Sequence, residues 1–160
     1  MRVKSTLLKP AIIFIVLAWF AVAGALKYSK TSSSHYERAL ISIANASLSV
    51  DIPLTRAGFS RGLGGRDALA ENEGMLFLCL PDPYQKFWMK EMSFPIDIVW
   101  IDESFTVLGV THRVSPESFP DVFTPARPAT HVLEVNAGVA EKYGIATGAM
   151  VFGLGGDGCR

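Results

Sequence analysis

An unbroken apolar run from Ala11 to Leu26 is the feature that most limits what this chain can form. A helix that is apolar on all sides needs a core larger than a chain of 160 residues can supply. Three cationic residues, Arg2, Lys4 and Lys9, precede the run, and this layout is typical of a secretory signal or a signal anchor. Because positive charge favours the cytoplasmic side, we expect the C-terminal domain to lie outside the cytoplasmic membrane.

Two fates are open for this N-terminal segment, residues 1–27. As a helix, the run spans about 24 Å, which is short against a hydrocarbon core of about 30 Å. Snorkelling by Lys9 and Lys27 would extend that span, so that residues 11–26 form a single-pass membrane anchor. The small residues between Ala21 and Ala25 offer a cleavage site instead, in which case the domain is secreted.

Composition divides the rest of the chain into three parts. Residues 28–37 are polar and rich in serine, as expected of a short linker. Residues 38–153 form a β-rich domain, and its size is sufficient for one core. Residues 154–160 form a Gly-rich tail that we expect to be flexible. A hydrophobic content of 49% with 19% charged residues excludes a disordered chain.

The charge balance excludes one class of partner. The formal net charge is zero and the sequence pI is about 6.8. Proteins that bind nucleic acid need a surplus of Lys and Arg to displace phosphate counterions. We therefore expect no nucleic-acid partner. The membrane, an envelope protein or a small ligand are the partners that fit an exported domain.

Short apolar segments bounded by turn residues predict a strand-dominated fold. Residues 40–52 are expected to form a hairpin that turns at Asn45-Ala46, since Leu48, Val50 and Ile52 alternate with polar residues. Further strands are predicted over residues 75–80, 94–101, 105–110, 130–135 and 149–152. The first two of these are continuously apolar, which fits strands covered on both faces.

Helices are expected to be few and short. Thr55 is placed to cap a helix over residues 56–63, and Gly144 to close a helix over residues 138–143. Four prolines make residues 115–128 a loop. The prediction is an α+β fold, a small rolled or barrel-like mixed β-sheet with one or two short helices, preceded by one N-terminal hydrophobic helix.

Several ordered blocks of the β-rich domain resemble one known family. The blocks are Arg61-Gly62-Leu63 with Arg66, Gly74-Met75-Leu76-Phe77, Phe87-Trp88-Met89-Lys90 leading to Phe94-Pro95-Ile96-Asp97, Leu133-Glu134, and the ending Gly138, Gly144-Ile145 and Gly148. Over about residues 40–153 this order resembles the family catalogued as domain of unknown function 192. The resemblance implies an exported or membrane-anchored domain, and it implies no particular biochemical activity.

The chain departs from that family at three points. Gly64 stands where the family usually has Met, and Glu91-Met92 where it usually has Asn-Thr. Ala149 stands where the family usually has Asp. Each change replaces an interacting side chain, which puts shared ligand chemistry at these points in doubt.

Asp97 is the most informative polar residue, because it lies within the apolar run 96–101. A buried, ionised carboxylate needs a partner or a raised pKa. Arg61, Arg66 and Lys90 are the candidate partners. Two interpretations stay open: a structural ion pair that clamps a short helix to the sheet, or a carboxylate at the base of a ligand pocket.

Trp88 and Met89 are the candidate rim of a cleft, beside the loop Pro81-Asp82-Pro83. In an extended segment, Trp88 and Lys90 would share one face, and Met89 would point to the other. Trp88 is therefore either a core residue or an exposed contact for a ligand or a protein partner.

No complete catalytic set is found. On a strand, His131 and Glu134 point to opposite faces, so we expect no metal site, and no cofactor motif is present. Ser60 has the spacing of a nucleophile elbow, but a helix is expected where the elbow needs a strand. We expect a non-catalytic accessory or ligand-binding domain. The alternative is a small envelope hydrolase with Asp97 or Glu134 as general base.

The two cysteines, Cys79 and Cys159, leave one question open. An oxidising compartment would permit a disulfide between them. Cys79, however, lies in the apolar run 75–80 and is predicted to be a buried small hydrophobe.

Overall fold

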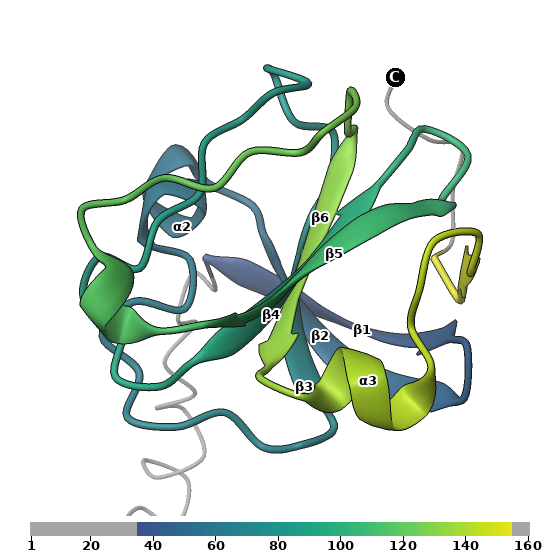
Figure 1. Cartoon of the computed structure of the whole chain (residues 1–160), viewed down its shortest axis with the longest axis horizontal. Helices are drawn as coiled ribbons and strands as arrows, with labels where there is room; N and C mark the ends of the chain where they lie inside the picture. Colours follow the sequence, from purple (N-terminus) through teal and green to yellow (C-terminus); the bar gives the residue numbers. More distant parts are fainter. Residues whose placement is uncertain (1–34, 155–160) are drawn as a thin grey trace, which may run out of the picture. The chain divides into compact units, whose positions relative to one another are not determined.

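The computed structural model describes residues 35–154 (Figure 1). The predictions for the N-terminal segment, for most of the linker, for Cys159 and for nearly all of the Gly-rich tail lie outside the described residues. Between residues 35 and 154, no helix combines the length and the apolar character that a membrane span requires.

Seven strands form one mixed sheet in the order β5-β4-β6-β3-β2-β1-β7. The strands are β1 (Tyr36–Ile43), β2 (Ala46–Pro53), β3 (Glu73–Phe77), β4 (Ile96–Ile101), β5 (Val107–Val114), β6 (His131–Asn136) and β7 (Val151–Phe152). The β2–β3 pair is parallel, and the other neighbours in the sheet are antiparallel.

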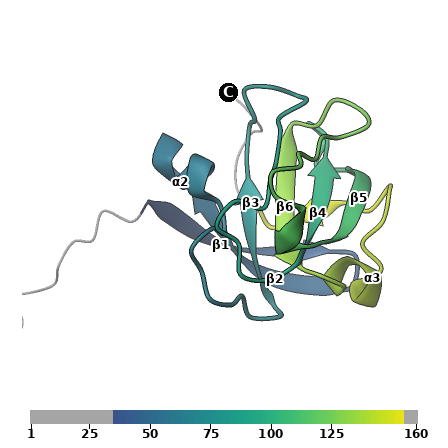
Figure 2. The ribbon, with the colours of Figure 1, turned by 60° about the vertical axis from the view of Figure 1, so that its left-hand side comes forward.

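The sheet curves into a half-barrel, with two short α-helices at opposite ends of it (Figure 2). These helices are α2 (Arg56–Arg61) and α3 (Val139–Tyr143), and a 3-10 turn, η1, covers Pro116–Ser118. The two outer strands meet through a bridge between Thr106 and Met150, next to β5 and β7. The prediction of a strand-dominated, rolled mixed sheet with short helices is confirmed.

Both predicted helices are present because the residues at their ends allow the chain to begin or end a helix there. The Thr55 side chain accepts a hydrogen bond from the backbone N of Gly58 at 3.1 Å and caps α2. Gly62 follows α2 with φ +56°, and Gly144 follows α3 with φ +71°. Glycine adopts such left-handed values without the strain that a side chain would cause.

The predicted hairpin is confirmed and is longer than the alternation indicated. The paired strands extend from Tyr36 to Pro53, so β1 includes two residues assigned to the linker. Of the remaining strands, β4 starts at Ile96 instead of residue 94, and β7 starts at Val151 instead of residue 149. The strand expected over 105–110 covers Val107–Val114.

The prediction for Cys79 is wrong. Strand β3 ends at Phe77, three residues earlier than expected, and Cys79 is exposed with φ +56°. The apolar sequence does not show where the strand ends, because Leu78 and Leu80 still pack as half-buried residues after the chain leaves the sheet. Cys79 is disulfide-bonded, and the other cysteine of the chain lies outside residues 35–154.

The core lies on both faces of the sheet. One face packs Leu76, Val99 and Leu133 against β1, β2 and α3. The other packs Phe77 and Ile98 with residues of the long loops. Because successive residues of a strand point to opposite faces, fully covered strands read as continuous apolar runs. Every residue of β4 is buried for this reason.

Candidate functional site

The five predicted polar residues do not form one cluster. Asp97 lies on β4 and points to the face that carries α3. Glu134 lies on the adjacent strand β6, where its backbone pairs with Ile98. Its side chain lines a cleft beside α2, together with Arg61 and Lys90. The one-residue offset between Asp97 and Ile98 sends the two carboxyl groups to opposite faces of the sheet.

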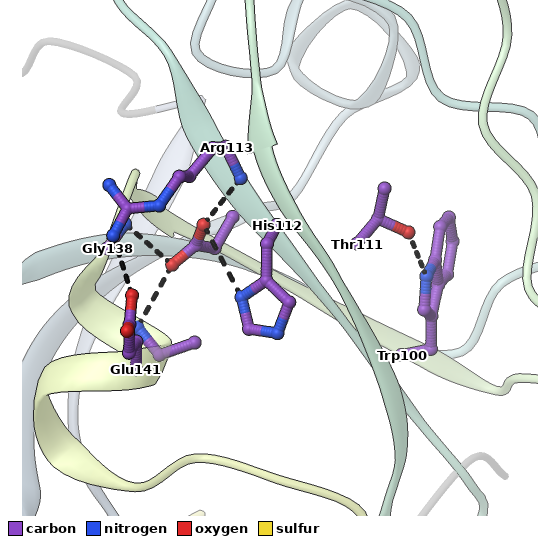
Figure 3. Close-up of polar contacts among 8 residues, drawn as sticks. Trp100, Thr111, His112, Arg113, Gly138 and Glu141 are labelled. Atoms are coloured by element: carbon purple, nitrogen blue, oxygen red, sulfur yellow. Dashed lines mark hydrogen bonds and ion pairs between the residues drawn. The ribbon is translucent and has the colours of Figure 1, made fainter.

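Asp97 is fully buried and is held by backbone N–H groups. Its Oδ1 accepts from the backbone N of Arg113 at 2.8 Å. Its Oδ2 accepts from the backbone N of Gly138 at 2.9 Å and of Ala140 at 3.0 Å. Figure 3 shows Arg113, Gly138 and His112 around this carboxylate. The carboxylate thus caps the start of α3 and ties it to β4 and β5.

The cationic partners predicted for Asp97 are therefore wrong. Among the described residues, the only Lys, Arg or His side-chain nitrogen within 4.0 Å of this carboxylate is the Nδ1 of His112, at 3.9 Å. The guanidinium of Arg113 instead pairs with Glu141 on α3, at 2.6 Å (Figure 3). The sequence does not show which backbone N–H groups will surround a side chain. Cationic side chains are therefore the only partners of Asp97 that it suggests.

Arg66 is committed to a different carboxylate, that of Asp51 on β2. One guanidinium nitrogen of Arg66 lies 2.9 Å from Asp51 Oδ2, and the Nε of Arg38 lies 2.9 Å from Asp51 Oδ1. Burial acts to raise the pKa of Asp51, but the hydrogen bonds from both arginines outweigh it and hold this pKa below its usual value.

A cleft of about 680 Å³ opens beside α2. It lies between α2, the end of β3 and the segment from residue 78 to 92. Its walls include four aromatic side chains: Phe59, Phe77, Phe87 and Trp88. Phe77 contacts both Phe59 and Phe87 edge to face, with ring centroids 5.5 Å and 5.2 Å apart. Such edge-to-face packing keeps an apolar wall in a fixed shape.

Four cationic side chains line the same cleft: Arg56, Arg61, Lys86 and Lys90. No ion pair within residues 35–154 involves any of them. Glu134 is the one acidic residue of the lining. The cleft is therefore strongly positive although the chain as a whole is neutral.

Glu134 is buried, with 5% of its surface exposed. Its Oε2 has no hydrogen-bond partner among the described residues. Burial raises the pKa of Glu134 to about 8, and the nearby Arg66 only partly offsets this effect. At neutral pH the side chain is thus mostly a neutral carboxylic acid, whose O–H can donate a hydrogen bond.

The predicted rim residues Trp88 and Met89 lie in different environments. Trp88 is 48% exposed and lines the cleft, whereas Met89 is 2% exposed and belongs to the core. The prediction of a rim is therefore wrong for Met89, and for Trp88 it stays a prediction. The alternation along this segment, with Phe87 and Met89 buried and Trp88 and Lys90 exposed, is the one expected of an extended chain.

Two cleft cations, Lys86 and Arg56, were missed in the sequence. Lys86 shares its spacing of two residues with Trp88 and Lys90, so the same alternation would have found it. Arg56 and Phe59 share a face of α2 at a spacing of three residues. That signal is weak in a helix of six residues.

His131 lies on the opposite face from Glu134, as predicted. It is fully buried, stacks on Phe105 with ring centroids 4.5 Å apart, and its Nδ1 accepts from the backbone N of Cys79 at 3.1 Å. Burial lowers the pKa of His131 and favours the neutral ring. Within residues 35–154, no group of three or more His, Cys, Asp or Glu side chains is arranged to hold a metal ion.

Ser60 lines the cleft, but it does not form a nucleophile elbow. It lies in the last turn of α2, preceded by helix rather than by a strand. An elbow holds its serine on a sharp turn between a strand and a helix. The local geometry at Ser60 is therefore different.

The fold and the cleft define a small half-barrel domain of the strand-dominated α+β class. The chain belongs to the family DUF192, described as Uncharacterized ACR, which matches residues 39–152. The resemblance noted in the sequence is thereby confirmed. No curated protein matches the chain.

Two solved structures are similar to this one. A proposed transcription regulator from Sinorhizobium meliloti 1021 is 25% identical, with a TM-score of 0.68 over 74% of this chain and 95% of that one. A protein of unknown function from Novosphingobium aromaticivorans DSM 12444 is 26% identical, with a TM-score of 0.69 over 76% of this chain and 89% of that one.

Proposed function

We propose that this protein is a non-catalytic ligand-binding domain whose ligand is a small amphiphilic anion. One observation carries the proposal: an aromatic cleft of about 680 Å³ that is lined by four cations without ion-pair partners in the described chain. Binding sites for small molecules are usually apolar clefts of about 300–1,000 Å³ with a few polar groups.

The aromatic and the cationic residues of the lining would contribute to binding in different ways. The aromatic walls would bury the apolar body of the ligand, at about 25 cal/mol for each Å² removed from water. The cations would pair with its anionic group, and a hydrogen bond to a charged group contributes about 1.5–3 kcal/mol. Trp88, exposed at 48%, is placed to cover a bound ligand.

The test uses two probes of nearly equal shape, 4-isopropylbenzoate and the neutral 4-isopropylbenzamide. Full-length protein in detergent is titrated with each probe, and the indole N–H signal of Trp88 is followed by NMR. The Trp100 indole, which donates to Thr111 Oγ1 at 2.9 Å, serves as an internal reference. We expect the benzoate to bind about tenfold more tightly than the benzamide.

Variants then separate the cleft from the rest of the surface. The double variant Lys86→Gln, Lys90→Gln should lose most of the preference for the benzoate. The control Lys142→Gln, which removes an exposed lysine paired with Glu71, should retain it. Equal affinity for the two probes, or no change at Trp88 with either, would refute the proposal.

The same proposal includes export and membrane anchoring through residues 11–26. It is supported by the cationic start and the apolar run of the sequence. Membrane fractionation with protease protection, followed by mass measurement of the N-terminus, would test the orientation and the cleavage together. Recovery of the full-length chain in the cytosolic fraction would contradict the anchor and leave the cleft proposal intact.

A hydrolase is the second candidate, and Glu134 is the observation that favours it. A buried carboxyl group in a cleft is a candidate general base, because a pKa raised towards the working pH makes its carboxylate form more basic. Asp97 no longer supports this candidate, because its oxygens are occupied by three backbone donors away from the cleft. Turnover of a 4-nitrophenyl ester that is lost in Glu134→Gln would favour the hydrolase over the binding domain.

We propose no DNA-binding role for this chain, although the similar Sinorhizobium protein is described as a transcription regulator. A net charge of zero provides no electrostatic basis for binding DNA.

A further inference from the structure

We propose that Glu134 determines the specificity of the cleft by donating a hydrogen bond to an uncharged oxygen at the buried end of the ligand. The inference rests on the proposed function and adds a second feature to the ligand class. The ligand would carry an anionic group at one end, an apolar body, and a carbonyl, ether or hydroxyl oxygen at the other end.

Glu134 Oε2 has no hydrogen-bond partner among residues 35–154. On the neighbouring strands, Glu134 is flanked by Met75 on β3 and Ile98 on β4, whose side chains are apolar. Its Oε2 is buried, and no described residue forms a hydrogen bond with it. A buried polar group in a native protein normally has a partner, so an unpaired one that lines a cleft indicates a partner from outside the chain.

A glycine, Gly62, lies next to the carboxyl group of Glu134. Gly62 comes directly after α2, and a Cβ atom placed there would lie 3.7 Å from Glu134 Oε2 and 3.5 Å from the Phe77 ring. Oε2 itself is shielded from solvent, so a ligand would reach the carboxyl group from the cleft side, where Glu134 is one of the lining residues.

The charged groups near Glu134 belong to Arg66 and to the lining of the cleft. Arg66 is near enough to act on it electrostatically, but its guanidinium bonds to Asp51 at 2.9 Å. The other charged residues of the lining are Arg56, Arg61, Lys86 and Lys90. With its pKa raised to about 8, Glu134 is mostly protonated at neutral pH and becomes a carboxylate as the pH rises further.

A neutral acid selects a different ligand from a carboxylate. The protonated form offers an O–H donor and is best matched by an uncharged oxygen acceptor. A carboxylate would instead favour a cation at the buried end of the ligand. The two alternatives are therefore separated by changing one substituent of a benzoate probe.

The experiment compares three probes that differ at the position para to the carboxylate. These are 4-acetylbenzoate, its near-isostere 4-isopropylbenzoate, and 4-(aminomethyl)benzoate. Full-length protein in detergent is titrated at pH 7, and the indole signal of Trp88 reports binding. We expect 4-acetylbenzoate to bind about tenfold more tightly than 4-isopropylbenzoate, the effect of one added hydrogen bond.

Variants of Glu134 assign this preference to its side chain. Glu134→Gln keeps an N–H donor and should keep the preference, whereas Glu134→Leu should lose it. Glu141→Gln, which changes an exposed glutamate on α3, is the matched control and should behave like the native protein. As the pH rises from 7 to 9.5, the preference of the native protein should decline and that of Glu134→Gln should stay constant.

The outcomes distinguish the role of Glu134 from the proposed function of the cleft. If the acetyl and isopropyl probes bind equally, the role of Glu134 is refuted while the cleft remains a site for anions. If the preference survives in Glu134→Leu, or if the aminomethyl probe binds most tightly, the role is also refuted. If 4-isopropylbenzoate itself fails to bind, the proposed function fails first.

Discussion

The role of Asp97 is best tested by removing its carboxylate. In Asp97→Ala, the backbone N–H groups of Arg113, Gly138 and Ala140 lose their acceptor inside the protein. These three donors hold the start of α3 against β4 and β5. Because Asp97 is fully buried, water does not replace the carboxylate without local opening of the structure.

The size of the effect follows from the number of bonds. Hydrogen bonds to a charged group contribute about 1.5–3 kcal/mol each, so the loss of three should lower the free energy of unfolding by roughly 4 kcal/mol or more. The total for a domain of this kind is about 5–15 kcal/mol. Asp97→Asn should cost only about half as much, because its one oxygen can still accept from Gly138 and Ala140.

The assay is urea unfolding of the full chain in a mild detergent, combined with hydrogen exchange at the amides of Gly138 and Ala140. Asp67→Ala is the control, since Asp67 is exposed, and it should change the free energy of unfolding by less than about 0.5 kcal/mol. If Asp97→Ala lost less than about 1.5 kcal/mol, or if Asp97→Asn were as stable as the native protein, the clamp would be refuted.

Three further predictions concern other positions. Gly74→Ala should cost about 1–3 kcal/mol in urea unfolding, because its Cβ would lie 2.8 Å from the Glu134 carbonyl oxygen, whereas Gly109→Ala, with open space around its Cβ, should be nearly neutral. The raised pKa of Glu134 favours the folded state below pH 4.5, and this contribution to stability should be lost as the pH rises to about 8. The urea midpoint of the native protein should therefore decline across that pH range more steeply than the midpoint of Glu134→Gln. The lowered pKa of Asp51 stabilises the fold above pH 3.8, and this contribution should disappear as the pH falls further, which acid titrations of Asp51→Asn would show by a weaker dependence.

The fold was largely predictable because its signals are local. Alternation in the first hairpin, the cap at Thr55 and the glycine after α3 each depend on neighbouring residues, and each was confirmed. The ends of the strands were less predictable. The run that includes Cys79 stays apolar after β3 ends, because Leu78 and Leu80 pack from a loop.

The site was less predictable because it depends on which faces of the sheet the strands expose. Asp97 and Glu134 were placed in one candidate cluster, yet they belong to opposite faces. Their separation depends on the register between β4 and β6, which pairs Glu134 with Ile98. A one-residue change of register would move a side chain to the opposite face of the sheet. No local pattern in either strand determines this register.

The two buried carboxyl groups predict opposite effects on stability. Three backbone donors stabilise Asp97, whereas Glu134 Oε2 has no partner among the described residues. An unsatisfied buried polar group costs about 1–3 kcal/mol, so Glu134→Leu should raise the free energy of unfolding by about 1 kcal/mol in the absence of ligand. A residue that destabilises the empty protein fits a role in binding better than a role in the core. Urea unfolding without ligand measures this directly, and a destabilised Glu134→Leu would mean that the carboxyl group has a structural partner inside the domain.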